Sequence, residues 1–217
     1  GILSATLCAK EAGITTVIVP RVNASEAAVV DGICVLGASS LSEVVAHLNG
    51  THILEPVIVE ATTPRTSQDD SFAHIQGQET AKRALIIAAA GGHNLLMTGT
   101  PGSGKTLLAR SIVGILPPLS LKEAIEVAKI QSSLGMLTGS VLELTRPFCA
   151  PHHTSSPAAL VGGGSTIRPG QITMAHRGVL FLDELPEFAR NVLEALRQPL
   201  EDGVVTVSRA TSSHILP

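Results

Sequence analysis

The residues with the clearest chemical meaning form one glycine-rich segment, Gly99-Thr100-Pro101-Gly102-Ser103-Gly104-Lys105-Thr106. The segment fills every fixed position of the pattern G-x-x-x-x-G-K-[ST], and it lies between an apolar run at 94–97 and a helical run at 107–115. A loop between a strand and a helix can aim backbone N–H groups, and the helix N-terminus, at phosphates. We therefore predict that this loop binds ATP, with Lys105 on the β- and γ-phosphates and the Thr106 hydroxyl on Mg²⁺.

A second segment places two carboxylates directly after an apolar run. The run at 178–182 is followed by Asp183 and Glu184. It predicts a buried parallel strand that presents both acids at its C-terminal edge. Asp183 would bind Mg²⁺ directly or through water, and Glu184 would activate the attacking water. The pattern is weak by itself, but downstream of a complete phosphate-binding loop we interpret it as the Walker B element.

Composition limits the other classes of function. The chain has 217 residues, 44% of them apolar and 15% charged, with a net charge of −3, so any contact with DNA must be local. It has no Trp or Tyr and only four Phe, which argues against a stacking platform for single strands. Cys8, Cys34 and Cys149 lie far apart, as expected for free thiols in a reducing cytoplasm. The longest apolar stretch, 84–97, is too short for a membrane span, and no signal peptide is visible, so we expect no membrane partner.

The first 50 residues predict a small α/β unit. We expect helices at 2–12, from Asn23 or Ser25 to about 30, and at 41–48 with Ser40 as the cap, and strands at 14–19 and 33–36. Residues 51–71 change to Thr, Pro, Ser and Asp, which indicates a linker, although 57–59 could add a short strand. We place the domain boundary near residue 70.

Residues 72–217 predict a P-loop domain with a parallel sheet. Helices are expected at 79–90, 107–115 and 121–134, the last with Ser120 as its cap. The segment 136–170 is rich in Gly, Pro and Ser, and we expect it to be functional or to contain short hairpins. After Pro186, one helical face is expected to carry Phe188, Val192, Leu196 and Leu200, followed by strands at 204–208 and 213–216.

With both landmarks placed, the chain resembles an AAA+ ATPase of the magnesium-chelatase-like group, and within that group the ComM or YifB proteins. The resemblance is carried by the segments 77–78, 82–85, 88–97, 146–154, 159–164, 168–170, 175–188 and 196–203. It implies a hexameric motor with nucleotide between subunits, contacts to the nucleotide from Ile75 and Gln78, and ATP-driven migration of DNA branches in recombination or natural transformation.

The resemblance also implies that parts of the motor are absent from this sequence. AAA+ sheets run in the order 5-1-4-3-2, and strands 4 and 5 would follow Pro217, so the P-loop strand would lack both neighbours. Sensor 1, the arginine finger and sensor 2 would lie there too. Because an arginine finger supplies roughly 10³–10⁵ in rate where it acts, we expect little or no turnover from residues 1–217 alone.

The stretch 1–23 resembles the end of a Lon-type protease domain, a fold like domain 2 of ribosomal protein S5. In that family a catalytic lysine falls on the position of Leu3, and the nucleophilic serine would lie upstream of Gly1. Leucine can neither activate a hydroxyl nor accept a proton. The resemblance therefore implies that residues 1–50 are the C-terminal part of a Lon-like domain without protease activity.

Two other groups of residues could carry chemistry. Cys149, His152, His153 and His176 could be imagined as a zinc site, but closed zinc sites usually come from two tight pairs, and adjacent histidines on a strand point apart. We expect these residues to shape a loop beside the motor pore or a subunit interface. Arg146, Arg168 and Arg177 could contact DNA phosphates or a neighbouring subunit's nucleotide, or could be structural.

Three classes of function remain open. The first is a DNA-translocating ATPase of the ComM type, which acts on branched DNA as a homo-oligomer with ATP and Mg²⁺. The second is the motor subunit of a magnesium-chelatase-type complex, in which a tetrapyrrole-binding partner replaces DNA. The third is a nucleotide-dependent assembly module without motor activity, against which Lys105, Asp183 and Glu184 argue. The Lon-like segment and the stretch 150–153 favour the first.

Overall fold

The computed structural model describes residues 1–58, 71–136, 142–163, 168–208 and 213–216. These residues belong to two compact units, Gly1–Arg65 with Ala124–Glu143, and Thr66–Glu123 with Leu144–Pro217. The contacts thus group 124–143 with the N-terminal residues, whereas the sequence predicted them in the second domain. The boundary expected near residue 70 stays a prediction. No helix among the described residues is long and apolar enough to cross a bilayer.

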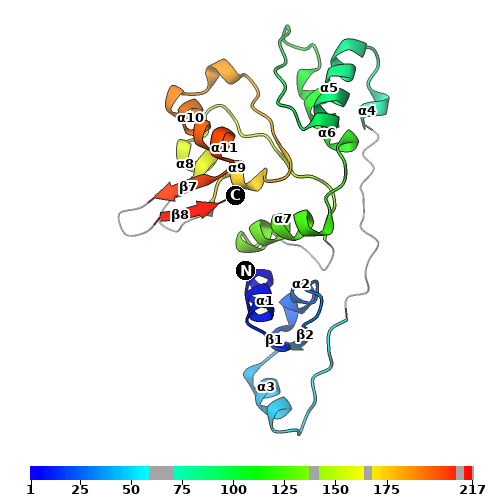
Figure 1. Ribbon diagram of the computed structural model, residues 1–217, viewed down its shortest axis with the longest axis vertical. Helices are drawn as coiled ribbons and strands as arrows, with labels where there is room; N and C mark the ends of the chain where they lie inside the picture. The colour runs from blue at the N-terminus through cyan, green and yellow to red at the C-terminus, as the bar shows by residue number, and fades with distance from the viewer. Residues whose placement is uncertain (59–70, 137–141, 164–167, 209–212, 217) are drawn as a thin grey trace. The chain divides into compact units, whose positions relative to one another are not determined.

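The first unit is built on two parallel strands, β1 (Thr16–Pro20) and β2 (Cys34–Ala38), which pair from Thr16 opposite Cys34 to Pro20 opposite Ala38. The helices of this unit are α1 (Ile2–Glu11), the 3₁₀ turn η1 (Arg21–Asn23), α2 (Ala24–Ala27) and α3 (Leu41–Leu48) (Figure 1). Val19, Ala24, Ala27 and Val35 form a core cluster between them. Leu3, at the position where the Lon resemblance implies a lysine, is only 1% exposed and packs against Val30 and Ala128.

Local signals place most of these elements, with two corrections. Ser40 caps α3 by accepting a hydrogen bond from the Glu43 backbone N–H, as predicted. The helix expected to reach residue 30 ends at Ala27, and the Asn23 side chain does not cap it but donates to Glu26. The strand expected at 57–59 is reduced to an isolated bridge between Leu36 and Pro56, with residue 59 outside the described ranges.

In the second unit, α4 (Ser71–His74) and α5 (Glu79–Gly91) both pack against α6 (Lys105–Ile115), which begins at the end of the glycine-rich loop (Figure 1). Gly92 ends α5 in the left-handed conformation (φ 64°), which glycine adopts without strain. Ile75, Leu85 and Leu108 form the core cluster of these helices. A further helix, α7 (Leu121–Ser133), starts in this unit, and its residues from Ala124 onward pack in the first.

The strand predicted at 94–97, directly before the loop, is not formed. These residues are irregular, and Leu95 and Leu96 are 41% and 74% exposed. A strand persists only when its N–H and C=O groups pair with a neighbour, and no described strand lies beside this segment.

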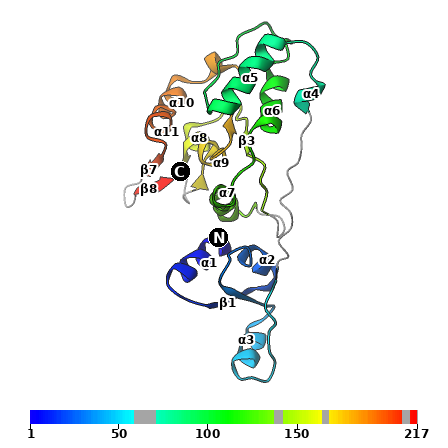
Figure 2. The same ribbon diagram turned by 45° about the vertical axis from the view of Figure 1, so that its right-hand side comes forward.

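The rest of the second unit brings short strands and helices together (Figure 2). β3 (Phe148–Cys149) pairs in parallel with β6 (Val179–Leu180), and β4 (Gly162–Gly163) pairs antiparallel with β5 (Arg168–Pro169). The helical elements are α8 (Pro157–Val161), α9 (Gln171–Met174), η2 (Leu185–Glu187), α10 (Arg190–Ala195) and α11 (Arg197–Asp202). The two strands predicted at the end of the sequence are present as β7 (Val205–Ser208) and β8 (Ser213–Leu216), and they pair antiparallel.

The prediction of one apolar helical face after Pro186 is only partly correct. Phe188, Val192 and Leu196 are buried and pack against Leu160, but Leu200 is 69% exposed. The chain forms two short helices instead of one. Pro199 lacks the N–H that a continuous helix would need, so the face turns away after Leu196.

The strand β6 is held close to β3 by a glycine. A Cβ at Gly178 would lie 2.0 Å from the carbonyl oxygen of Pro147, a distance that no side chain tolerates. The backbones can therefore approach and form hydrogen bonds of 2.8 Å from Val179 N–H to the Pro147 carbonyl and from Phe181 N–H to the Cys149 carbonyl. The strand is shorter and more exposed than the buried strand that the sequence predicted, because β3 is its only partner among the described strands.

Candidate functional site

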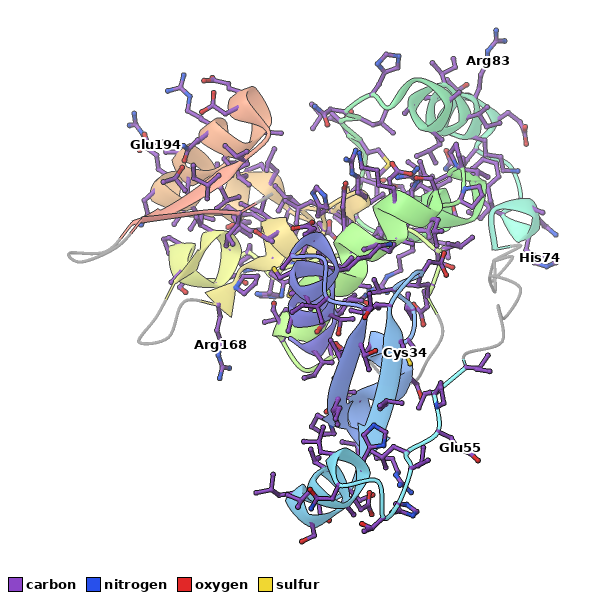
Figure 3. The ribbon with its side chains drawn as sticks, turned by 60° about the horizontal axis from the view of Figure 1, so that its bottom comes forward. Cys34, Glu55, His74, Arg83, Arg168 and Glu194 are labelled. Atoms are coloured by element: carbon purple, nitrogen blue, oxygen red, sulfur yellow. The ribbon has the colours of Figure 1, made fainter. Side chains whose placement is uncertain are left out.

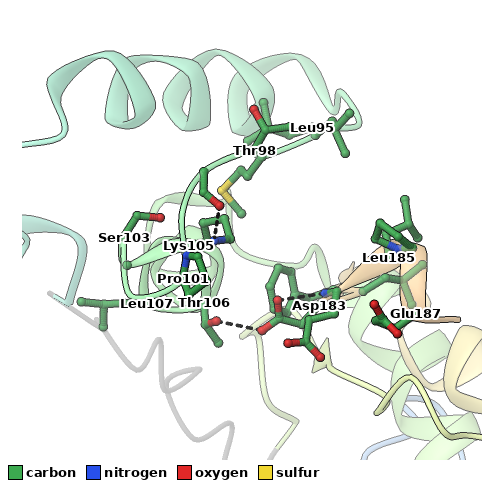
Figure 4. A pocket seen from close by; sticks show the side chains of 18 of the residues that line it. Leu95, Thr98, Pro101, Ser103, Lys105, Thr106, Leu107, Asp183, Leu185 and Glu187 are labelled. Carbon is green, nitrogen blue, oxygen red and sulfur yellow. Dashed lines mark hydrogen bonds between the residues drawn. The ribbon is translucent and has the colours of Figure 1, made fainter.

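The glycine-rich loop reaches α6 through two glycines in the left-handed conformation. Gly102 and Gly104 both have positive φ (77° and 84°), and Gly104 is the N-cap of α6, with no side-chain acceptor on the first turn. The first-turn N–H groups of a helix have no partner within the helix, so they can donate to an anion. The Lys105 ammonium lies 3.0 Å from the Gly99 carbonyl oxygen and 2.9 Å from that of Thr100 (Figure 4).

A hydrogen bond joins the two sequence landmarks. The Thr106 hydroxyl donates to the Asp183 carboxylate over 2.9 Å, across 77 residues of sequence (Figure 4). The other Asp183 oxygen accepts from the Glu184 backbone N–H at 3.0 Å, which fixes the carboxylate plane. A hydroxyl and a carboxylate side by side are the oxygen donors that Mg²⁺ prefers when it also binds phosphates.

A cleft of about 1120 Å³ separates the loop from the segment after β6. It is lined by residues 95–99 and 101–107 on one side and by residues 180–187 on the other (Figure 4). Lys105, Thr106, Asp183 and Glu184 all face this cleft. The structure thus brings together the residues that the sequence assigned to phosphate, metal and water.

A second cavity, of about 690 Å³, adjoins the same loop and contains the other two predicted nucleotide contacts. Its lining includes Ile75, Gln78 and the loop residues 102–104. Gln78 adopts the left-handed conformation (φ 56°), and its amide nitrogen lies 3.5 Å from the Ser103 carbonyl oxygen. Ile75 is buried against Leu85 and Leu108. Both residues therefore lie at the loop, and their contact with a nucleotide base stays a prediction.

Sequence reasoning missed one partner in the site. The His153 Nδ1 lies 3.2 Å from a carboxylate oxygen of Glu184. The pair of histidines was noted in the sequence, but expected to point apart as on a strand. Instead, the His152 and His153 rings lie 4.1 Å apart because the segment is a loop, in which side chains do not alternate.

The other residues of the imagined zinc site are not arranged to hold a metal. Across the described ranges, no group of three or more His, Cys, Asp or Glu side chains has such an arrangement. Cys149 is buried in β3, and burial raises the pKa of its thiol, so the thiol stays protonated at neutral pH.

Two of the three arginines considered for DNA or nucleotide contact have internal partners. Arg146 donates at 2.7 Å to the carbonyl oxygens of Pro117 and Arg177, and its guanidinium lies 3.7 Å from Glu123. Arg177 lies 3.8 Å from the same carboxylate. Hydrogen bonds from the Ser120 backbone N–H and hydroxyl, assisted by both arginines, lower the pKa of Glu123. This cluster braces the turn that leads into β6.

The third arginine, Arg168 on β5, is exposed, and Figure 3 shows it extending away from the ribbon. It is therefore available to a partner, unlike Arg146.

Comparison with known protein families shows the family to which this chain belongs. Residues 71–217 match the family described as magnesium chelatase, subunit ChlI. The chain belongs to this family. The resemblance inferred from the sequence is thereby confirmed, as is the predicted α/β fold class of an AAA+ P-loop core, in keeping with the parallel β3–β6 pair.

Individual relatives extend the match over the N-terminal residues. The chain is 46% identical over 201 residues to YifB of Escherichia coli, covering 93% of this chain and 40% of that protein. It is 44% identical over 221 residues to competence protein ComM of Haemophilus influenzae, covering 100% and 43%. The 67 kDa subunit of magnesium chelatase from Chlorobaculum parvum is 28% identical over 151 residues, covering 68% and 22%. The chain thus spans less than half the length of these relatives.

Proposed function

We propose that this chain carries the ATPase site of a DNA motor of the ComM type. The observation that carries the proposal is the hydrogen bond between Thr106 and Asp183, which joins the phosphate-binding loop to the segment that bears the second carboxylate. Such a juxtaposition is what in-line transfer of a phosphoryl group to water requires, since the metal and the water must both reach the γ-phosphate.

Each residue of the cleft has a role in this proposal. The N–H groups of the loop 99–106 hold the phosphates, and the Lys105 ammonium exchanges the carbonyl oxygens of Gly99 and Thr100 for phosphate oxygens. Thr106 and Asp183 would hold Mg²⁺, and the bound ion would supply positive charge against the phosphate oxygens. Glu184 accepts a proton from the attacking water. Ile75 and Gln78 contact the nucleotide from the second cavity.

The choice of DNA as partner rests on similarity. The match to a competence protein runs over the whole chain, whereas the match to the chelatase subunit is weaker and covers 68% of it. We infer that the protein acts on branched DNA in the cytoplasm as a homo-oligomer, with a hexamer the expected form. Exposed Arg168 is one residue that could contact a DNA phosphate.

A chelatase motor is the second candidate, favoured by the description of the family. In that case the site would hydrolyse ATP in the same way, but a tetrapyrrole-binding protein would stimulate it. A non-motor assembly module is disfavoured because Lys105, Asp183 and Glu184 are all present and face one cleft.

The test is ATP hydrolysis by the full-length protein with and without a four-way DNA junction, with Lys105→Ala as the blank. We expect hydrolysis that the junction increases several-fold more than duplex DNA of the same length does. Hydrolysis that is indifferent to DNA would reject the DNA motor and favour the chelatase candidate. Nucleotide binding without hydrolysis would favour the assembly module.

A further inference from the structure

The Nδ1 atom of His153 lies 3.2 Å from a carboxylate oxygen of Glu184. We propose that His153 is a positioning residue, which holds the Glu184 carboxylate in the orientation from which it accepts a proton from water. The proposal rests on the proposed function of Glu184 as the base. It adds a residue outside both sequence landmarks to the site.

Glu184 needs an external restraint. Its side chain is 65% exposed, and its backbone adopts the left-handed conformation (φ 53°, ψ 47°) at the turn between β6 and η2. An exposed glutamate with three rotatable side-chain bonds samples many conformations, and few of them place an oxygen within hydrogen-bond reach of a water on the γ-phosphate. A carboxylate has two oxygens, so one can be held by a partner while the other faces the water.

His153 is able to supply that restraint because its own ring is held. The His153 side chain is 28% exposed, against 65% for Glu184. Its ring lies edge-on to Phe188, with centroids 6.4 Å apart at an angle of 80°, and Phe188 is buried in the core with Leu160 and Val192.

The His153 ring also lies beside that of His152, with centroids 4.1 Å apart, and the His152 Nδ1 lies 2.9 Å from the Thr154 hydroxyl. The imidazole is thus anchored to the core and to its own loop. With the proton on Nδ1, the imidazole donates to the Glu184 carboxylate over the observed 3.2 Å.

The test compares three substitutions at position 153 in the full-length protein. His153→Ala removes the donor, His153→Asn keeps an amide N–H close to the position of Nδ1, and His153→Gln moves the amide about one bond further out. We expect His153→Ala to lower kcat by about 10- to 100-fold, the range that a misplaced reacting group costs. KM for ATP and the affinity for ADP should stay within about twofold, because the phosphate contacts are unchanged. His153→Asn should recover most of kcat, and His153→Gln should not.

Exposed His52 in the first unit supplies the matched control, since His52→Ala removes an imidazole that does not line the cleft. An unchanged kcat in His153→Ala, or a loss of kcat matched by a loss of ADP affinity, would overturn the positioning role while hydrolysis by the wild type would leave the proposed function intact. If the wild type hydrolyses no ATP, both fail together. Should His153→Ala not fold, the difference between the Asn and Gln variants decides, and equal rates in these two would reject the proposal.

Discussion

Thr106 and Asp183 show at the scale of single residues why the two landmarks belong to one site. Their hydrogen bond is made by the Thr106 hydroxyl and not by its methyl group. Thr106→Ser keeps the hydroxyl, and Thr106→Val keeps the shape but removes it. We expect Thr106→Val to reduce the gain in ATP affinity that Mg²⁺ produces by about tenfold or more, as loss of a metal-orienting group typically does. Thr106→Ser should behave as wild type.

The measurement is isothermal titration with ATP at several Mg²⁺ concentrations. Binding of ATP without Mg²⁺ should be similar in all three proteins, because the loop N–H groups and Lys105 still contact the phosphates. A Thr106→Val protein with normal Mg²⁺ dependence would mean that Thr106 is not a ligand.

The sequence predicted the residues of the cleft because their signal is local. Four fixed positions within eight residues identify the loop, and an apolar run followed by two acids identifies Asp183 and Glu184. The contact of His153 with Glu184 could not be predicted in this way. It depends on a loop conformation that stacks two adjacent histidines and on Phe188, which fixes the ring from a different segment.

At the scale of elements, too, features with a local sequence signal were predicted, and features that depend on distant segments were not. The helices α3, α5 and α6 were predicted nearly to the residue, because a serine cap, a terminal glycine pair and the P-loop mark their ends. The strand at 94–97 was predicted and is not formed, since pairing depends on a neighbour elsewhere in the chain. Likewise, the spacing of apolar residues after Pro186 correctly predicted that Phe188 and Val192 are buried. It could not predict that the helix breaks before Leu200.

One ionisable group joins three elements of the first unit. The Glu26 carboxylate in α2 accepts hydrogen bonds from the Leu3 backbone N–H in the first turn of α1 and from the Ser132 hydroxyl in α7. Burial opposes ionisation of Glu26, but these hydrogen bonds, with one from Asn23, outweigh it, so its pKa lies below the usual value for a glutamate. The carboxylate is only partly buried, so its effect on stability is moderate.

A lowered pKa in the folded state gives a definite sign to the pH dependence. The stabilisation by Glu26 is present above about pH 4.3, the usual pKa of glutamate, and is lost as the pH falls through the lower pKa of the folded state. We expect Glu26→Gln to be less stable than wild type at pH 7 by about 1 kcal/mol, and the difference to shrink toward pH 3. Urea-dependent hydrogen exchange of residues 1–38 would measure this unit alone. Glu11→Gln, at the exposed end of α1, should show no such difference, and a gap that widens in acid would contradict the assignment.

At the scale of the whole molecule, the residues predicted to do chemistry lie in one unit, and the other unit is described by its core. The residues predicted to bind nucleotide all belong to the second, whereas the first has a core around Leu3, Val19 and Val35, and none of its described residues lines the cleft. The Leu3 position illustrates the division, since a buried leucine stabilises a fold but cannot do the chemistry of the lysine that the Lon resemblance implies there.

This division predicts where a bound nucleotide changes the molecule. A ligand at 100 times its Kd stabilises the state that binds it by about 2.7 kcal/mol, and amides that donate to phosphate are protected directly. With a non-hydrolysable ATP analogue and Mg²⁺, we expect slower hydrogen exchange at 99–108 and 180–187 and unchanged exchange at 1–38. Hydrogen exchange with mass spectrometry measures both in one experiment, and Lys105→Ala should abolish the change. Equal protection of residues 1–38 would show that the nucleotide acts on both units, and no protection at 99–108 would place it elsewhere.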